Sequence, residues 1–250
     1  MKGQEWVALV IGNTRLHWGF FVGRELQFVW DTPHIASLAE GMSILARKVS
    51  LRSATPDLWI ASVVPQQTEL WAGYARTFDL TLKNIPLNGM YATLGIDRAL
   101  AAWSASKNGA ALVMDAGTAL TFTGVDSEQS LIGGAILPGL GLQLRSLSHG
   151  TAALPLVESL TLPDRWARDT QGAITSGILY TLVAGIESFV QDWQKRFPGS
   201  NVVLTGGDGE LLLQSLRQVN PVLANSIQLE PNLVLLAIAI LRNQPTNLPP

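Results

Sequence analysis

The sequence lacks cysteine, carries few charged residues and contains no long apolar run. Without cysteine among its 250 residues, disulfide scaffolds and cysteine-ligated zinc sites are excluded. The 17 Lys and Arg residues nearly balance the 19 Asp and Glu residues, so no basic surface is available for the phosphates of duplex DNA. The most apolar run, residues 233–241, has about half of the ~20 residues that a membrane span needs. We therefore expect a cytoplasmic protein that binds neither nucleic acid nor a membrane.

The length and the low charge set the scale of the molecule. At ~150 residues per domain, a chain of 250 residues fits one large domain or two small ones, each with its own core. Only 14% of the residues are charged, against ~25% in an average globular chain. Much of the surface is therefore uncharged, which favours association between subunits.

Two segments share one order of apolar strand, tight glycine-threonine turn and apolar strand. The first runs from residue 6 to residue 22 and the second from residue 110 to residue 124. Placing Gly12 on Gly117, an offset of 105 residues, aligns the strands and the turns of both segments. The chain is therefore predicted to contain a duplicated unit.

The most regular helical pattern lies between Asp169 and Phe197, where apolar residues recur every three or four positions. Asp169 or Thr170 is its predicted N-cap. The other predicted elements are strands at 58–64, 131–137 and 201–205 and helices at 97–106, 140–147, 210–218 and 231–242. We expect a first lobe over residues 1–108 and a second over residues 109–250.

Three turns rich in glycine or threonine follow apolar strands. They are Gly12-Asn13-Thr14, Gly117-Thr118 and Gly206-Gly207. Glycine lets backbone N–H groups converge without obstruction by a Cβ atom, and hydroxyls add donors, so such turns can hold phosphate oxygens. One such turn alone is weak evidence, because an ordinary hairpin or strand-to-helix turn explains it more simply. Three of them, two related by the duplication, favour a nucleotide held between two similar lobes.

Asp97 and Arg98 begin the predicted Ala-rich helix. A carboxylate there is favoured by the helix dipole and by free N–H groups, so Asp97 is either an N-cap or a functional group. In the functional interpretation, Asp97 accepts the proton of a hydroxyl group while Arg98 holds an anionic substrate. Phosphoryl transfer asks little basicity of such a group, because its position matters more than its pKa.

Other polar and glycine-rich positions leave alternatives open. Asp115 ends a buried strand, where a carboxylate serves a cation or phosphate site or joins an ion-pair network. The segment 133–139 is either a closely packed strand and turn or a flat platform for a base. The three histidines have no metal-ligand spacing and are predicted to be structural or surface residues; they are His17, His34 and His149.

Seven short segments, taken together and in order, resemble the type III pantothenate kinases. This family belongs to the superfamily that joins acetate and sugar kinases with actin and the heat-shock ATPases. The segments are Ile11-Gly12-Asn13-Thr14, Ala61-Ser62-Val63-Val64-Pro65, Gly95-Ile96-Asp97-Arg98, residues 115–121, residues 133–139, Thr151-Ala152-Ala153-Leu154-Pro155 and Leu204-Thr205-Gly206-Gly207-Asp208. They extend over almost the whole chain.

The resemblance implies a fold and a reaction. The implied fold is α/β, with two similar ribonuclease-H-like (actin-like ATPase) lobes, each a mixed sheet with flanking helices. The implied reaction is the phosphorylation of pantothenate by ATP to 4′-phosphopantothenate, the first step of coenzyme A biosynthesis. The family further implies Mg²⁺, a monovalent cation (K⁺ or NH₄⁺) and a homodimer.

The resemblance also implies roles for individual residues. Asp97 would be the catalytic base, and Asp115 would lie by the monovalent cation. The substrate would be bound by Tyr91, Gly95, Arg98 and Thr151. The ATP-binding residues would be Gly12, Asn13, Thr14, Arg15, Gly117, Thr118, Thr121, Gly133, Gly134, Pro138, Gly139, Gly206 and Gly207.

Val10 departs from the family pattern, which has Asp at this position. The internal alignment agrees, since Val10 falls opposite Asp115. Valine cannot ligate a hard cation that prefers oxygen, so a carboxylate expected near Mg²⁺ is missing. An active kinase is the main interpretation, because Asp97, Arg98 and Asp115 are present. The alternatives are a weakened or inactive nucleotide-binding relative that acts as a regulator, and a kinase that acts on a sugar or acetate.

Overall fold

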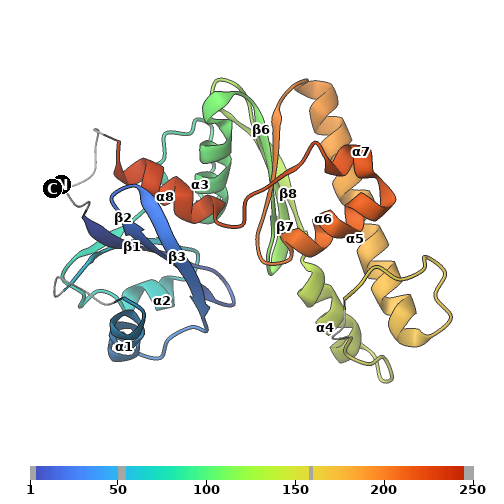
Figure 1. Cartoon of the computed structure of the whole chain (residues 1–250), viewed down its shortest axis with the longest axis horizontal. Coiled ribbons are helices and arrows are strands. Elements are labelled where there is room, and N and C mark those ends of the chain that lie inside the picture. Colours follow the sequence, from blue (N-terminus) through green and yellow to red (C-terminus); the bar gives the residue numbers. More distant parts are fainter. Residues whose placement is uncertain (1–3, 50–54, 158–159, 245–250) are drawn as a thin grey trace. The chain divides into compact units, whose positions relative to one another are not determined.

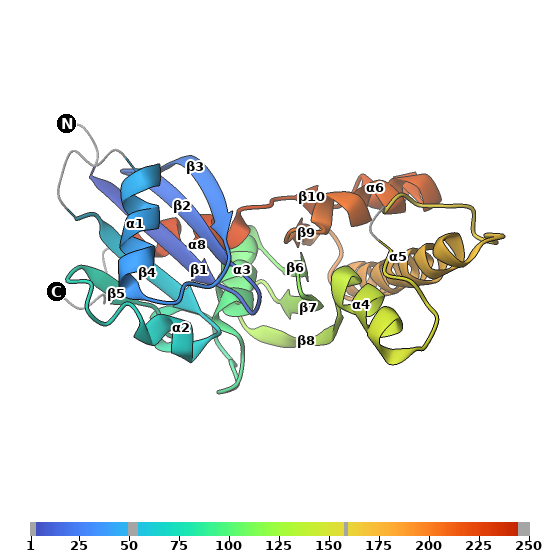
Figure 2. The same ribbon diagram turned by 90° about the horizontal axis from the view of Figure 1, so that it is seen from below.

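The computed structural model describes residues 4–49, 55–157 and 160–244. Its chain divides into two compact units (Figure 1, Figure 2). The first unit comprises Met1–Ser104 with Leu233–Pro250, and the second comprises Ala105–Asn232. The predicted division, 1–108 and 109–250, differs mainly at the C-terminal end. The last helix packs on the first unit, because its apolar residues cover a sheet face there.

The first unit is built on a mixed five-stranded sheet with the order β3-β2-β1-β4-β5. β1 pairs antiparallel with β2 and parallel with β4, β2 pairs antiparallel with β3, and β4 pairs parallel with β5. Its strands are β1 (Glu5–Ile11), β2 (Leu16–Val22), β3 (Glu25–Thr32), β4 (Asp57–Ser62) and β5 (Thr77–Asp79).

Helices cover both faces of this first sheet. The helical elements of this part of the chain are α1 (Leu38–Lys48), α2 (Pro65–Glu69), a 3-10 turn (Leu82–Asn84), α3 (Ile96–Ala105) and α8 (Leu233–Arg242). On one face, Leu9 and Ile11 of β1 join Ile44 of α1 in a single apolar core. On the other, α8 approaches so closely that a Cβ atom at Gly19 would lie 3.1 Å from Leu235 Cδ1.

The second unit repeats this architecture with the strand order β10-β9-β6-β7-β8. Its strands are β6 (Ala111–Ala116), β7 (Ala119–Val125), β8 (Leu131–Pro138), β9 (Asn201–Thr205) and β10 (Gln228–Leu229). Its helices are a 3-10 turn (Ser106–Asn108), α4 (Leu140–Gly150), α5 (Thr170–Arg196), α6 (Gly209–Val219) and α7 (Pro221–Ala224). Apolar residues of α4, α5 and α6 pack on one face of this sheet and form its core.

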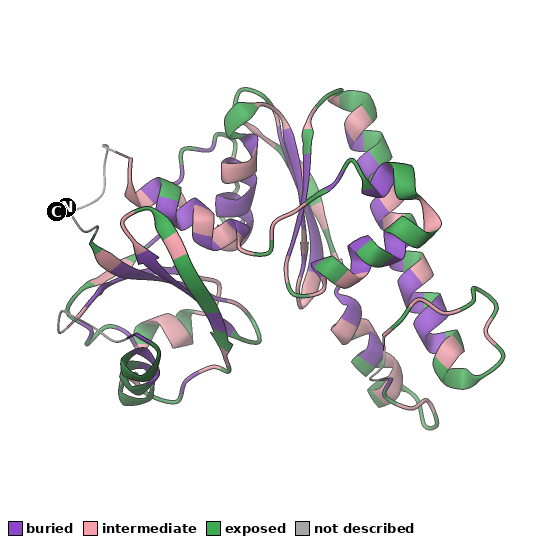
Figure 3. Ribbon diagram, in the orientation of Figure 1, coloured by how far each residue is buried: buried purple, intermediate pink, exposed green. Residues whose placement is uncertain are grey.

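The longest helix, α5, begins as its sequence predicts. Asp169 is the N-cap, and its carboxylate accepts a hydrogen bond of 2.8 Å from the Gly172 N–H. Within the described residues, α5 is long and apolar enough to cross a membrane by length and composition alone. Half of its most apolar stretch is buried inside the structure (Figure 3). Ile178 and Leu182 join the core of the second unit. This burial identifies α5 as a core helix.

The predicted duplication is confirmed by the topology of the two sheets. Each contains three antiparallel strands in succession, followed by two strands that are parallel to the first strand of that unit. The α/β fold with two mixed sheets and flanking helices is therefore confirmed. The connections β1–β2 and β6–β7 are not identical, because the first spans residues 12–15 and the second only residues 117–118.

Candidate functional site

The β1–β2 loop of the first unit is exposed and is tied down at both ends. The Gly12 N–H donates a 3.0 Å hydrogen bond to the Arg15 carbonyl, which closes the turn. The Gly12 carbonyl accepts a 2.8 Å hydrogen bond from Nε2 of His34. Asn13 and Thr14, between these anchors, are exposed to solvent. A Cβ atom at Gly12 would meet only the Arg15 carbonyl, at 3.4 Å, so this loop has room around it.

The corresponding β6–β7 loop of the second unit is packed against its own neighbours. The Gly117 N–H donates to the Ala119 carbonyl at 3.0 Å, and the Gly139 N–H donates to the Thr118 carbonyl at 2.9 Å. A Cβ atom at Gly139 would overlap the Gly117 carbonyl oxygen and lie 2.7 Å from that of Thr118. Glycine at 139 is therefore required for the start of α4 to approach this loop.

The β9–α6 turn reaches the same place in the second unit. Gly206 has a φ of +90°, and a Cβ atom there would overlap Oδ1 of Asp115 and lie 2.6 Å from the Ala116 backbone. The Asp208 N–H donates to the Ala116 carbonyl at 2.9 Å. Thr121 lies directly opposite Asp115 on β7. The structure thus brings Asp115, Thr121 and the glycines of three turns to one end of the second sheet.

The glycines of β8 lie apart from this cluster. Pro138 precedes Gly139 and pairs with Ala119 at the loop end of the strand. Gly133 and Gly134 pair with residues farther along β7, roughly 15 Å away at the rise of an extended strand. β8 is an edge strand, and Gly133 has a φ of +142° with nothing within 4 Å of an added Cβ atom.

Asp97 lies in the first turn of α3, where its carboxylate is held by local contacts. Oδ1 accepts a 2.7 Å hydrogen bond from the Arg98 N–H. A Cβ atom at Gly95 would lie 2.6 Å from Oδ1, so glycine at 95 makes room for this carboxylate. Burial raises the pKa of Asp97 above its ordinary value, and the hydrogen bond and charge of Arg98 partly oppose this rise.

Arg98 brings a second predicted substrate residue to Asp97. Its side chain is buried, and Nη1 donates a 3.1 Å hydrogen bond to the hydroxyl of the exposed Tyr91. Tyr91, Gly95, Asp97 and Arg98 therefore form one cluster at the start of α3. This cluster combines a carboxylate of raised pKa with a guanidinium held in place by its neighbours.

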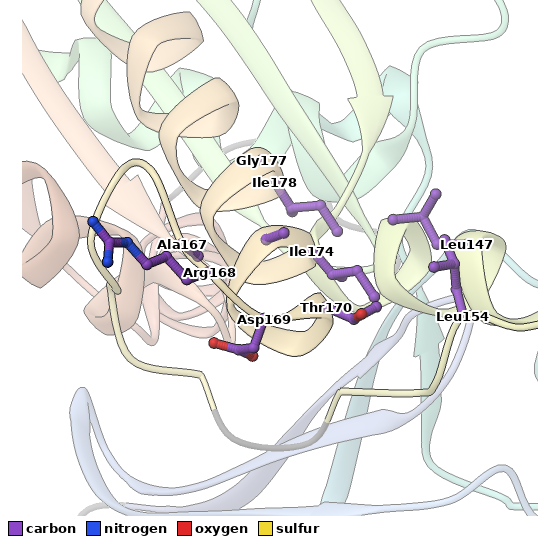
Figure 4. Close-up of a pocket in the computed structure, with 10 residues that line it drawn as sticks. Leu147, Leu154, Ala167, Arg168, Asp169, Thr170, Ile174, Gly177 and Ile178 are labelled. Atoms are coloured by element: carbon purple, nitrogen blue, oxygen red, sulfur yellow. The ribbon is translucent and has the colours of Figure 1, made fainter.

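Thr151 ends α4 in the second unit, beside a cavity of about 720 Å³. Its hydroxyl donates to the Leu147 carbonyl at 2.8 Å and accepts from the Leu154 N–H at 3.3 Å. Leu147 and Leu154 line the cavity opposite the first turns of α5 (Figure 4). Thr151 thus braces one wall of a largely apolar cavity.

Sequence reasoning missed the cross-strand neighbours of Val10. Val10 pairs with His17 on β2, and His17 in turn pairs with Asp31 on β3. Nδ1 of His17 and Oδ1 of Asp31 are 2.7 Å apart, and Arg15 lies 3.5 Å from the other carboxylate oxygen. The signal that could have found this cluster is the hairpin register, which places residues of adjacent strands side by side.

The described residues contain no group of three or more His, Asp or Glu side chains that could hold a metal ion by themselves. Mg²⁺ commonly relies on one or two carboxylates together with substrate phosphates and water. Asp115, beside three glycine turns, has the chemistry for such a role.

Repeated topology and paired glycine-threonine loops define the class of fold. The chain is an α/β protein of two similar units, each built on a mixed five-stranded sheet with flanking helices. A solved structure titled as a conserved putative Baf family transcriptional activator from Campylobacter jejuni superposes with a TM-score of 0.62 over 94% of this chain and 96% of that chain. At 19% identity, this likeness concerns the fold alone.

The sequence comparisons identify the family. The profile described as type III pantothenate kinase matches residues 6–192. A type III pantothenate kinase of Nostoc sp. is 45% identical, over 92% of this chain and 91% of the relative. One of Synechocystis sp. is also 45% identical, over 97% of this chain and 92% of the relative. The chain belongs to the type III pantothenate kinase family, which confirms the resemblance found in the sequence.

Proposed function

We propose that this chain transfers the γ-phosphoryl group of ATP to pantothenate, forming 4′-phosphopantothenate in the first step of coenzyme A biosynthesis. Membership of the type III pantothenate kinase family supports both the substrate and the reaction. The observation that carries the proposal within the structure is the cluster of Tyr91, Gly95, Asp97 and Arg98 at the start of α3.

In this proposal Asp97 accepts the proton of the primary hydroxyl of pantothenate. The hydrogen bond from the Arg98 N–H fixes Oδ1, and the absence of a side chain at Gly95 leaves space for the carboxylate. The raised pKa makes the ionised carboxylate of Asp97 a stronger base than that of an exposed aspartate. A loose phosphoryl-transfer transition state depends mainly on the position of the attacking oxygen, which such a fixed base controls.

The remaining substrate residues would hold the ends of pantothenate. Arg98 carries the charge that pairs with the pantothenate carboxylate, and the Tyr91 hydroxyl restrains its guanidinium. Gly95 would allow the substrate chain to pass close to the backbone. Thr151 would contact pantothenate from the second unit of the same or of a partner subunit, and a homodimer is part of this proposal.

The glycine-rich loops would bind ATP through their backbone N–H groups and hydroxyls. The residues assigned to this role are Gly12, Asn13, Thr14, Arg15, Gly117, Thr118, Thr121, Gly133, Gly134, Pro138, Gly139, Gly206 and Gly207. The tight packing around Gly139 and Gly206 supports a cradle of fixed shape in the second unit. The use of ATP and pantothenate supports a cytoplasmic location.

Asp115 is the residue of the second unit that fits a cation. Its carboxylate lies in a space that a Cβ atom at Gly206 would fill, which supports an oxygen-lined site for K⁺ or NH₄⁺ or for the water shell of Mg²⁺. When bound with ATP, Mg²⁺ neutralises charge on the β- and γ-phosphates. Val10 supplies no oxygen, so the first unit must use other groups for this purpose.

A direct assay tests the proposed function. Purified chain is incubated with ATP, Mg²⁺, K⁺ and pantothenate, and phosphopantothenate is measured by mass spectrometry. We expect product from the natural chain and almost none from Asp97→Asn. A preference for a sugar or for acetate in a parallel panel of acceptors, or normal turnover by Asp97→Asn, would contradict the proposal.

Val10 favours a second candidate function. A relative without the first carboxylate could bind nucleotide and pantothenate without turnover and act as a regulator. The same assay separates the two functions. Nucleotide binding by calorimetry without any phosphopantothenate would support the regulator.

A further inference from the structure

Four residues form one row across the first sheet at the level of Val10. Asp31 on β3 pairs with His17 on β2, His17 pairs with Val10 on β1, and Val10 pairs with Ala61 on β4. Residues that lie directly opposite each other in antiparallel strands project from the same face, with Cβ atoms about 5 Å apart. His17 is therefore the nearest polar side chain of β2 to the position where the family has a carboxylate.

The equivalent row of the second sheet has a different composition. It contains Ile136, Thr121, Asp115 and Thr205 in the same strand order. Here the carboxylate lies on the central strand and the outer position is apolar. In the first sheet the carboxylate, Asp31, lies on the edge strand, and a histidine lies between it and the central strand. The carboxylate of the first row therefore lies two strands away from the position on the central strand that carries Asp115 in the second row.

Asp31 fixes the state of the His17 ring. Nδ1 is 2.7 Å from Oδ1 of Asp31, and a carboxylate oxygen can only accept a hydrogen bond, so Nδ1 carries the proton. In the neutral ring, Nε2 then holds a lone pair and can accept a hydrogen bond. Arg15 lies 3.5 Å from the second oxygen of Asp31 and forms an ion pair with it.

Nε2 of His17 is buried and has no hydrogen-bond partner among the described residues. A buried polar atom without a partner destabilises a folded protein, and such atoms are commonly completed by water, an ion or a ligand. The loop that follows Val10 carries Gly12, Asn13 and Thr14, which are assigned to ATP. Nε2 is therefore a hydrogen-bond acceptor without a donor among the described residues, and it lies in the β1–β2 hairpin whose loop is assigned to ATP.

We propose that His17, oriented by Asp31, replaces the carboxylate that is absent at Val10. Nε2 accepts a hydrogen bond from the water shell of the divalent cation that accompanies ATP. Mg²⁺ retains several waters in proteins, so an acceptor that faces these waters orients the ion without ligating it directly. This inference rests on the proposed use of ATP by the chain, and it explains how a kinase of this family tolerates valine at position 10.

The primary test is calorimetric binding of a non-hydrolysable ATP analogue, with Mg²⁺ and separately with EDTA. His17→Phe keeps a ring of similar size but removes both nitrogens. We expect it to weaken binding of the Mg²⁺ complex by about 10- to 100-fold, as is typical when a residue that orients a metal site is lost. Binding of the metal-free analogue should change less than about threefold. The matched control, His149→Phe at an exposed position of α4, should change neither value.

A rescue experiment distinguishes the proposed role from a general loss of packing. Adding Val10→Asp to His17→Phe supplies an oxygen acceptor at the neighbouring position and should restore most of the lost Mg²⁺-dependent affinity. Val10→Asp alone should change the Mg²⁺-dependent affinity less than it does in the His17→Phe background. The effects of the two substitutions on this affinity are therefore non-additive. Asp31→Asn leaves His17 in place and should cause a partial loss of the Mg²⁺-dependent affinity. It serves as the second variant if thermal unfolding shows that His17→Phe is not folded.

The outcomes separate the inference from the proposed function. Equal weakening with Mg²⁺ and with EDTA would show that His17 acts independently of the metal and overturn the inference, and so would unchanged binding in both His17→Phe and Asp31→Asn. Failure of the natural chain to make phosphopantothenate while it binds the Mg²⁺ analogue would contradict the proposed function but leave the binding test of His17 intact.

Discussion

The two sheets have the same strand order and pairing directions, yet their loop ends are built differently. In the second unit, added Cβ atoms at Gly139 and Gly206 would overlap neighbouring groups of the turns they approach. In the first unit, a Cβ atom at Gly12 would meet one carbonyl at an ordinary contact distance. Backbone pairing preserves a duplicated scaffold, whereas the loop ends are free to diverge in packing and charge.

The charged groups diverge in the same way. The second unit has its carboxylate, Asp115, on the central strand within the packed turns. The first unit has Val10 at that position, with Asp31 and His17 on the outer strands and Asp97 on α3. The proposed proton acceptor thus belongs to one unit and the proposed phosphate cradle to the other.

The largest expected effect is on turnover. It tests whether Asp97 of the first unit acts in proton transfer while the glycine turns of the second unit bind ATP. Asp97→Asn should lower kcat by about 10²- to 10⁴-fold, since it removes a general base but keeps the shape of the side chain. Binding of ATP should remain within a few-fold of the natural value. The measurement is steady-state kinetics with calorimetric ATP binding, and an equal loss of both properties would assign Asp97 to the nucleotide instead.

The raised pKa of Asp97 predicts that both activity and stability depend on pH. Turnover requires the carboxylate, so activity should fall on the acid side at a higher pH than an ordinary aspartate would give. The raised pKa means that the folded chain favours the protonated form, so stability is lost as the pH rises through the folded-state pKa. Asp97→Asn should therefore be at least as stable as the natural chain at neutral pH, as measured by urea unfolding, although it is inactive.

Gly206→Ala and Gly139→Ala test how tightly the glycine turns of the second unit are packed. Alanine at 206 must adopt a φ of +90° and push against the Ala116 backbone, and alanine at 139 must displace the 117–118 loop. Each substitution should lower the free energy of unfolding by more than about 2 kcal/mol and abolish activity. Stability near that of the natural chain in either variant would show that the turns are looser than the structure describes.

The next effect concerns α8, which the first unit gains from the end of the chain. Asp57 is buried and accepts from Nη2 of Arg242 on α8 at 3.4 Å and from the Gln4 amide at 2.7 Å. Asp57→Ala leaves the Arg242 charge in a buried environment beside the Trp6 ring and should cost about 3 kcal/mol in urea unfolding. Arg76→Ala, at a half-exposed partner of Asp57, should cost about 1 kcal/mol or less.

The smallest expected effect is at the open loop of the first unit. Gly12→Ala places a methyl group in ordinary contact with the Arg15 carbonyl and should change the free energy of unfolding by at most about 0.5 kcal/mol. A rise in KM for ATP without loss of stability would then report a direct contact between this loop and the nucleotide. A loss of stability as large as that expected for Gly206→Ala would remove the contrast between the two loops.

Much of the secondary structure around the candidate site could be predicted. The strand at 201–205 and the strand at 16–22 coincide with β9 and β2, and the Asp169 cap of α5 is confirmed. β3 and α1 were not identified. Most of the residues of β3 are exposed or only partly buried, so its sequence lacks the regular alternation that marks a strand with one buried face.

Local sequence by itself determined most of the strands around the candidate site, the glycine turns, the duplication and the family. Those features depend on hydrophobic period and backbone freedom, which neighbouring residues specify. Only the tertiary structure decided that α8 joins the first unit, that Gly206 makes room for Asp115, and that His17 lies between Val10 and Asp31. These contacts join residues far apart along the chain or depend on strand register, and both are set by the packing of the whole sheet.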